Sequence, residues 1–199
     1  FRISKKDKYL SIYSDVVVQE KIHGSNISIV GYLNGEKWIF KIGSRKRWVE
    51  NHEKFNNIQI LFEQNKDKFI NLFNELAPIK SGSIVRIYGE VYGGKYGGAT
   101  DKNAIKTQSE PNYCSHNDFA FFDLFVGQQN VPILEALSLI QKHGLKIAPI
   151  IYTGPLSNFI DSFNVNTFKS VVSKLFYNLD YIDTPKGTEG VTIRTTNPD

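Results

Sequence analysis

The chain has 199 residues, a net charge of +4 and 41% hydrophobic residues, a composition typical of one folded domain rather than a disordered chain. Cys114 is the only cysteine, which excludes a disulfide framework within the chain, and we expect an intracellular protein, cytoplasmic or nucleoplasmic. No apolar run reaches membrane-spanning length, so we expect no membrane partner, and the positive charge indicates an anionic one.

The N-terminal part of the chain carries strand signals. β-Branched residues over 15–20 predict a first strand, and residues 26–33 predict a second. Asn34-Gly35 matches a two-residue hairpin turn because both residues tolerate positive φ, and residues 38–42 return as the partner strand.

A long helical pattern follows this hairpin. Apolar residues recur at helical spacing over 52–76, which predicts one helix or two, and Pro78 lies where a helix should end. Residues 83–91 predict another strand, followed by a loop over 93–117 that is rich in glycine and lysine. The near-continuous apolar run over 119–126 is typical of a buried strand.

The C-terminal part has weaker signals. Asn130 is a candidate helix cap, with Pro132 in the first turn and Gly144 after the end. Residues 165–178 show a weak helical pattern, and residues 188–195 predict a last strand. Because strands and helices do not alternate regularly, we predict an α+β fold with mainly antiparallel sheets flanked by helices.

Several familiar kinds of site are missing from the sequence. It contains no Gly-x4-Gly-Lys-Ser/Thr loop and no Gly-x-Ser-x-Gly elbow, and its four histidines and one cysteine do not have the spacing of zinc ligands. We therefore expect neither a P-loop, a serine-hydrolase elbow nor a zinc site.

The segment Glu20-Lys21-Ile22-His23-Gly24-Ser25-Asn26 combines a lysine with a glycine between two predicted strands. A glycine there permits a tight turn and a close approach of the backbone to a phosphate, and a lysine becomes a nucleophile when its pKa is lowered. The minimal Lys-x-x-Gly pattern is weak by itself, because Lys95-Tyr96-Gly97-Gly98 also fits it.

Further motifs agree with this segment, and they follow in order. Glu20–Asn26 resembles the nucleotidyl-lysine motif of ATP-dependent RNA ligases, the family typified by the phage ligase that seals nicks in duplex RNA and by the trypanosome editing ligases. Four later segments resemble the motifs that follow it: Ser44-Arg45, Tyr88–Gly93, Phe121–Leu124 and Glu189–Arg194. The resemblance covers residues 20–194 and implies the nucleotidyltransferase (adenylation) domain of the ligase superfamily.

The resemblance also implies a reaction and its partners. Lys21 would attack the α-phosphate of ATP, expel pyrophosphate and carry AMP covalently. The AMP would pass to the 5′-phosphate of an RNA, and a 3′-hydroxyl, at a nick in a duplex, would then displace it. Mg²⁺, with Mn²⁺ as a substitute, is the implied metal ion because a hard cation offsets phosphate charge.

By the same resemblance, Lys21, His23 and Glu189 are the implied catalytic residues, and Glu189 together with Glu90 would hold the metal ion. The positions implied to bind the nucleotide are Glu20, Asn26, Arg45, Glu90, Phe122 and Arg194. Phe122 is favoured over its neighbour Phe121 for stacking on adenine, from the family pattern. Lys95, Lys102 and Lys106 are candidates for contact with the RNA backbone, with a solvated basic loop as the alternative.

The chain departs from the family in one respect. Family members carry a fifth motif with two spaced lysines soon after the fourth, whereas this chain ends at Asp199 before such a pair. We therefore expect residues 1–199 to be an adenylation domain, truncated before that motif, with no C-terminal domain represented.

Two alternatives remain open. One is an ATP-dependent DNA ligase or a capping guanylyltransferase of the same superfamily, although the DNA-ligase signature has Asp in place of His23 and Arg in place of Asn26. The other is a non-catalytic domain that binds nucleic acid, which the positive charge and the 13% aromatic content would also suit.

Overall fold

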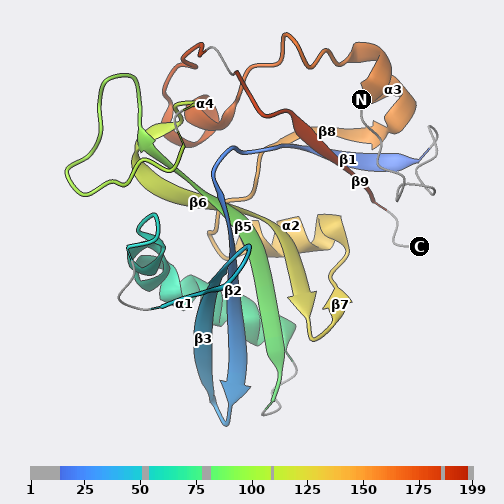
Figure 1. The fold of residues 1–199 in the computed structure, drawn as a ribbon. Helices are drawn as coiled ribbons and strands as arrows, with labels where there is room; N and C mark the ends of the chain where they lie inside the picture. Colours follow the sequence, from blue (N-terminus) through green and yellow to red (C-terminus); the bar gives the residue numbers. More distant parts are fainter. Residues whose placement is uncertain (1–13, 51–53, 78–81, 109, 185–186, 197–199) are drawn as a thin grey trace.

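A computed structural model describes residues 14–50, 54–77, 82–108, 110–184 and 187–196 of the chain. It contains two antiparallel sheets with helices packed against them (Figure 1), which confirms the predicted α+β class. The larger sheet has six strands in the order β4-β3-β2-β5-β6-β7. Their bounds are β2 Ser25–Asn34, β3 Lys37–Ser44, β4 Trp48–Val49, β5 Ile84–Lys95, β6 Cys114–Val126 and β7 Gln129–Asn130.

The smaller sheet has three strands. Its central strand β1, Asp15–Glu20, pairs with β8, Ile150–Pro155, on one side and with β9, Val191–Thr195, on the other. The short helices α3, Leu156–Ser162, and α4, Val172–Tyr177, lie in the same half of the molecule. Among the described helices, none is long and apolar enough to cross a membrane.

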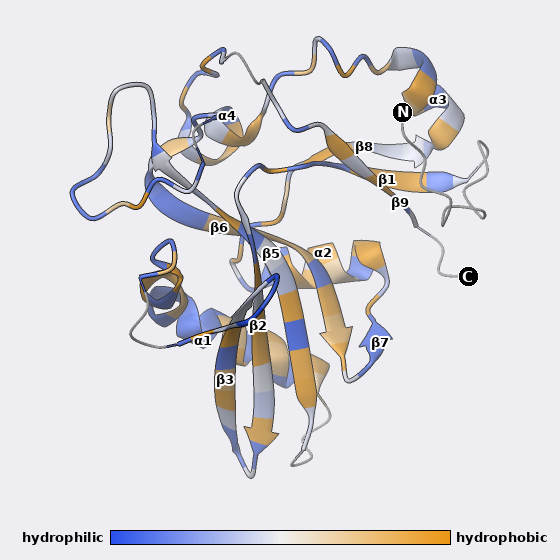
Figure 2. Cartoon of the chain, viewed as in Figure 1, coloured by the Kyte–Doolittle hydropathy of each residue, from blue (hydrophilic) through white to orange (hydrophobic). Residues whose placement is uncertain are grey.

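The main core lies between the six-stranded sheet and two helices, α1, Ile58–Leu76, and α2, Ile133–Lys142. Phe69 on α1 is fully buried and contacts the rings of Phe119 and Phe121 on β6. Both helices lie behind the sheet in Figure 1, and hydrophobic residues alternate with polar ones along its strands in Figure 2. The opposite face of the sheet therefore has neither of these two helices packed on it.

The path of the chain between the sheets determines where the site forms. β1 ends at Glu20 in the three-stranded sheet, and β2 begins at Ser25 in the six-stranded sheet. Residues 21–24 therefore cross from one sheet to the other. Any functional group on this short connection lies where the two sheets meet.

Two boundaries in the first half differ from the sequence prediction. The hairpin turn is Gly35-Glu36 rather than Asn34-Gly35, because Asn34 still pairs with Lys37 and only Gly35 has a positive φ. The helix predicted over 52–76 begins at Ile58, because the two residues before it, Asn56 and Asn57, have left-handed φ values of 47° and 58°. Residues 51–53 and Pro78 lie outside the described part of the chain.

The predicted helix start at Asn130 is wrong, because Asn130 belongs to β7 and Pro132 is the N-cap of α2. Gly144, with a φ of 72°, follows the end of α2 as predicted. β5 and β6 extend into the predicted loop over 93–117, and the pattern over 165–178 yields only α4. The sequence analysis did not predict β8 and α3.

Candidate functional site

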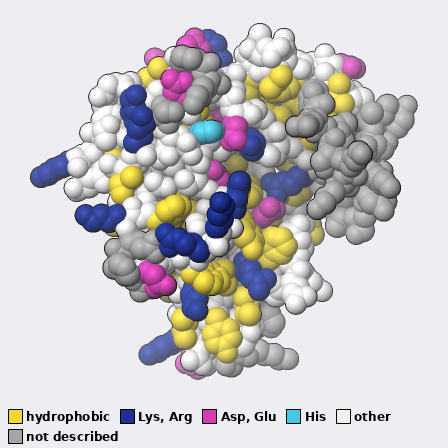
Figure 3. Space-filling model, in the orientation of Figure 1, with side chains coloured by type: hydrophobic (Ala, Val, Ile, Leu, Met, Phe, Trp, Pro, Cys, Tyr) yellow, Lys and Arg dark blue, Asp and Glu magenta, His cyan; other side chains and the backbone are white. Residues whose placement is uncertain are grey.

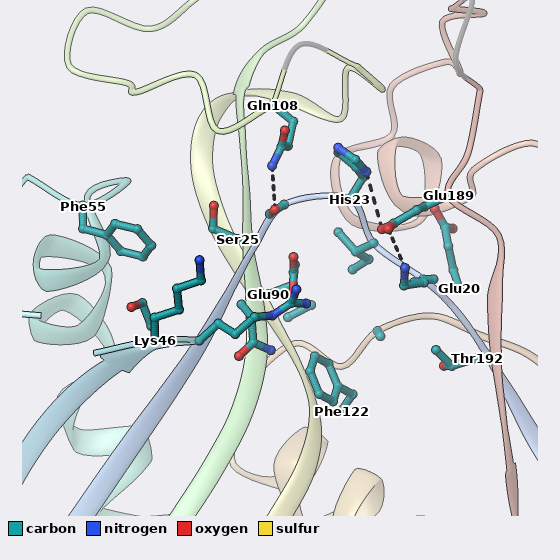
Figure 4. A pocket seen from close by; sticks show the side chains of 18 of the residues that line it. Glu20, His23, Ser25, Lys46, Phe55, Glu90, Gln108, Phe122, Glu189 and Thr192 are labelled. Atoms are coloured by element: carbon teal, nitrogen blue, oxygen red, sulfur yellow. Dashed lines mark hydrogen bonds and ion pairs between the residues drawn. The ribbon is translucent and has the colours of Figure 1, made fainter. Parts of the chain in front are cut away.

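A cavity of about 700 Å³ opens where the two sheets meet. Its wall includes residues 20–26, which run from the end of β1 to the start of β2, residues 44–47 at the end of β3 and after it, and residues from β5, β6, β9 and the segment before β9. All the predicted site residues except Arg194 line it. Figure 4 labels His23, Glu90, Phe122 and Glu189 among them, on separate elements around the cavity. The fold therefore gathers groups that lie far apart in the sequence.

Lys21 is held at the cavity wall by the segment before β9. Its Nζ donates a hydrogen bond to Glu189 Oε1 at 2.5 Å, and its backbone N–H donates to the Gly190 carbonyl at 2.9 Å. His23 Nδ1 lies 3.5 Å from the other oxygen, Glu189 Oε2 (Figure 4). Because 49% of the Lys21 side chain is exposed, a ligand in the cavity can reach the amine.

Two side chains that the sequence analysis did not identify fix the connection that carries Lys21. The backbone N–H of His23 donates to the Tyr113 hydroxyl at 3.0 Å, and Gln108 Nε2 donates to the Gly24 carbonyl at 2.8 Å. Both partners come from the segment between β5 and β6. The contacts join residues more than 80 positions apart in the chain, so no local sequence signal reveals them.

Gly24 is required by a close approach of two backbones. A Cβ atom at this position would lie 2.2 Å from the Val91 carbonyl oxygen and 2.9 Å from Cγ of Glu90. Only a residue without a side chain lets the connection lie this close to β5. The glycine thus brings Lys21 and Glu90 into one cavity.

Glu90 lies on β5 and carries a perturbed carboxyl group. Burial is the main cause that raises the pKa of Glu90 to about 7, and the negative charge of Glu189 contributes to the same shift. The positive charges of Arg45 and Lys21 oppose it. Two carboxyl groups that repel each other beside a cavity can bind a hydroxyl group or a cation.

Glu20 lies deeper, with only 1% of its surface exposed. Its Oε2 accepts a hydrogen bond from the Val171 N–H at 2.9 Å, and burial raises its pKa to about 6. Oε1 is buried and has no hydrogen-bond partner among the described residues. A buried acceptor of this kind is costly unless a ligand supplies a donor.

A β-bulge separates the roles of the two neighbouring phenylalanines on β6. Tyr88 pairs with Asp123 and Gly89 pairs with Phe121, so Phe122 has no partner opposite it on β5. Phe121 is fully buried against α1, whereas Phe122 lines the cavity. The irregularity therefore turns one ring into the core and the other toward the site.

Asn26 and Arg45 complete the predicted set around the cavity. Asn26 Nδ2 donates to the Gly89 carbonyl at 3.4 Å, and the exposed Arg45 follows β3. Lys95, Lys102 and Lys106 do not belong to the cavity wall.

The structure places Arg194 outside the cavity wall. Its Nη1 donates to Asp123 Oδ1 at 2.5 Å, and its Nη2 donates to Gln19 Oε1. Burial raises the pKa of Asp123, and the guanidinium opposes that shift. Arg194 therefore supports β6 next to Phe122.

The described residues contain no cluster of three or more His, Cys, Asp or Glu side chains that could hold a metal ion by themselves. Mg²⁺ commonly binds through one or two carboxylates and substrate phosphates. Glu90 and Glu189 provide hard oxygen ligands, and the charge of Glu189 contributes to the raised pKa of Glu90, so the two residues fit that kind of site.

Comparison with known proteins gives one family and a set of related folds. The family described as RNA ligase matches residues 14–199. Compared by sequence with curated proteins, the chain has no significant match.

Three solved structures illustrate the similarity of fold. A lysine-to-alanine variant of Naegleria gruberi RNA ligase with ATP and Mn is 15% identical, with a TM-score of 0.57, and the match covers 92% of this chain and 47% of that one. A lysine-to-methionine variant of the same ligase with AMP and Mn gives the same identity, TM-score and coverage. An archaeal ATP-dependent RNA ligase is 18% identical, with a TM-score of 0.55 and coverage of 92% and 40%. This chain thus spans less than half the length of these proteins.

Proposed function

Since the chain belongs to the RNA ligase family, we propose that it is the adenylation domain of an ATP-dependent RNA ligase that works through a lysyl-AMP intermediate. The nitrogen of Lys21 attacks the α-phosphorus of ATP, a P–N bond forms, and the bond to the β-phosphate oxygen breaks to release pyrophosphate. An oxygen of the 5′-phosphate of an RNA then attacks the same phosphorus, so that the P–N bond breaks, Lys21 regains its amine and the AMP passes to the RNA. A 3′-hydroxyl finally attacks that phosphate and releases AMP.

The observation that carries this proposal is the contact between the Lys21 amine and Glu189 within a nucleotide-sized cavity. An ammonium group has no lone pair, so it must lose a proton before it attacks phosphorus. Glu189 Oε1, 2.5 Å away, is placed to take that proton. His23, on the other side of the same carboxylate, helps to keep the carboxylate oriented toward the lysine.

The other cavity residues suit a bound adenylate. The Phe122 ring offers a face for the adenine, whereas the buried Glu20 carboxyl, which accepts from the Val171 N–H, braces the connection that carries Lys21. Arg45 supplies a permanent cation for a phosphate or the sugar. Glu90, with its pKa near neutrality, can bind ribose hydroxyls.

We further propose that Glu90 and Glu189 hold a divalent metal ion together with phosphate oxygens. When bound, Mg²⁺ or Mn²⁺ would offset the negative charge of the phosphates. The protein's own contribution is positioning: in-line displacement at phosphorus depends on where the nucleophile is held.

Labelling the protein with ATP or GTP that carries a radioactive α-phosphate tests the first step. We expect ATP and not GTP to label the wild-type chain, and Lys21→Ala to abolish the label. Lys95→Ala is the matched control, since Lys95 begins the other Lys-x-x-Gly sequence but does not line the cavity. Labelling of Lys21→Ala at the wild-type level would refute the covalent lysine, and labelling by GTP alone would favour a capping enzyme.

A sealing assay tests the RNA substrate. We expect joining at a nicked duplex when the 3′-hydroxyl strand is RNA, and much slower joining when that strand is DNA, because a 2′-hydroxyl distinguishes the two. Equal joining of both strands would favour the DNA-ligase alternative.

A further inference from the structure

A second, smaller depression adjoins the main cavity on the sheet face opposite α1 and α2. Its volume is about 320 Å³. It is lined by Ser28, Gly43, Ser44, Lys46, Arg47 and Trp48. Ser44, Lys46 and Arg47 also line the main cavity. The two hollows therefore share the turn between β3 and β4 as a common wall.

Gly43 keeps this depression open beneath an aromatic ring. A Cβ atom at Gly43 would lie 2.6 Å from Ser28 Oγ and 3.4 Å from ring atoms of Trp48. Trp48 itself is 50% exposed. An indole ring left this open to solvent beside a small hollow offers a flat surface on which a planar group can stack.

Lysine side chains lie near the ring and along the wall of the depression. Lys41 Nζ lies 5.8 Å from the centroid of the Trp48 ring, and the exposed Lys46 borders both hollows. Figure 3 shows lysine and arginine side chains interspersed with hydrophobic ones over this face. Alternating aromatic and cationic groups are complementary to a nucleic-acid strand, whose bases stack on rings and whose phosphates pair with cations.

We infer that this depression is a nucleotide subsite for the RNA strand whose end reacts in the main cavity. In this subsite Trp48 stacks on a base, and Lys41 and Lys46 bind the flanking phosphates. Because every base has a face on which an aromatic ring can stack, we expect this subsite to bind RNA with little preference for one base over another. The identity of the ligand as RNA rests on the proposed function.

The fluorescence of Trp48 provides a direct test. The chain has two tryptophans, so Trp38→Phe leaves Trp48 as the reporter. We expect a 5′-phosphorylated RNA oligonucleotide to quench this fluorescence as it binds. The midpoint of the quenching titration should equal the midpoint of the binding curve, which the anisotropy of a labelled RNA measures independently. Binding of RNA without any change in Trp48 fluorescence would overturn the stacking contact.

Substitutions separate the subsite from the main cavity. We expect Trp48→Ala to weaken RNA binding about tenfold and Trp48→Phe to keep most of the wild-type affinity. ATP should label both variants at the wild-type rate, since Trp48 does not line the main cavity. Tyr32→Ala is the control, because Tyr32 is 43% exposed on the same sheet but belongs to neither hollow. Lys41→Ala should reduce the salt dependence of RNA binding by about one ion.

The outcomes distinguish this inference from the proposed function. Unchanged RNA affinity in a folded Trp48→Ala protein, or an equal loss in Tyr32→Ala, would overturn the subsite while leaving covalent labelling intact. Loss of labelling in Trp48→Ala would assign the ring to ATP and would also overturn the subsite. Absence of labelling in the wild-type chain would instead contradict the proposed function.

Discussion

Gly24→Ala tests whether the close approach of the β1–β2 connection to β5 sets the reactivity of Lys21. The added Cβ atom would lie 2.2 Å from the Val91 carbonyl oxygen, roughly 1 Å closer than an ordinary contact allows. Backbone cannot rotate away as a side chain does, so the connection must move by about that distance. A displacement of about 1 Å at a reacting group can cost about 100-fold in rate.

We therefore expect Gly24→Ala to slow covalent labelling by ATP about 100-fold, measured in single-turnover time courses. Overpacking of this kind also costs about 1–3 kcal/mol of stability, so thermal unfolding should show a lower midpoint. Gly98→Ala is the matched control, since its Cβ atom would meet nothing within 4 Å. Labelling of Gly24→Ala at the wild-type rate would show that the distance between these backbones does not control the nucleophile.

Three other predictions concern single side chains around the cavity. Burial raises the pKa of Glu90 from 4.5 to about 7, so the folded state holds this proton more tightly than the unfolded state, and the stability of the wild type falls as the pH rises through that interval. Glu90→Gln should therefore be more stable than the wild type at pH 8, by on the order of 1 kcal/mol, and should lose this advantage by pH 4. Thermal unfolding of both proteins at the two pH values measures the difference. Phe122→Ala should raise the ATP concentration needed for half-maximal labelling and, because this ring is only partly buried, should cost less stability than Phe121→Ala, which should cost about 3–5 kcal/mol in chemical denaturation. Equal effects of the two substitutions would contradict the bulge assignment. Arg194→Ala leaves the half-buried Asp123 carboxylate without its cation and should lower the free energy of unfolding by about 1–3 kcal/mol at neutral pH. The double variant with Arg194→Ala and Asp123→Asn should recover part of this loss. No recovery would mean that the ion pair is not the source of the effect.

The sequence motifs predict much of this cavity because each motif is attached to a strand. Lys21 and Glu189 are 168 positions apart, yet one follows β1 and the other precedes β9, and these strands pair. A strand prediction over 15–20 and another over 188–195 thus nearly suffice to place both residues together. Arg194 shows the limit of this reasoning, because its motif position is on β9 but its side chain turns to Asp123 and Gln19.

Other features depend on contacts that a local pattern cannot contain. Gln108 and Tyr113 hold the β1–β2 connection through single hydrogen bonds to its backbone, and neither residue has a periodic neighbour that would reveal this role. Apolar spacing places the helix start too early, because the spacing continues across Asn56 and Asn57, whose left-handed backbone delays the start of the helix without changing the pattern.

These contacts bear on how the protein would promote the reaction. Separate elements hold the three residues Lys21, His23 and Gly24 by backbone hydrogen bonds: the Gly190 carbonyl, the Tyr113 hydroxyl and the Gln108 amide. Three anchors on four connecting residues leave the backbone little freedom, while the Lys21 side chain stays half exposed. Displacement at phosphorus gains most from a nucleophile held in line with its target. In the proposed mechanism, these long-range contacts therefore fix the position of the lysine, and the carboxylate of Glu189 would accept its proton.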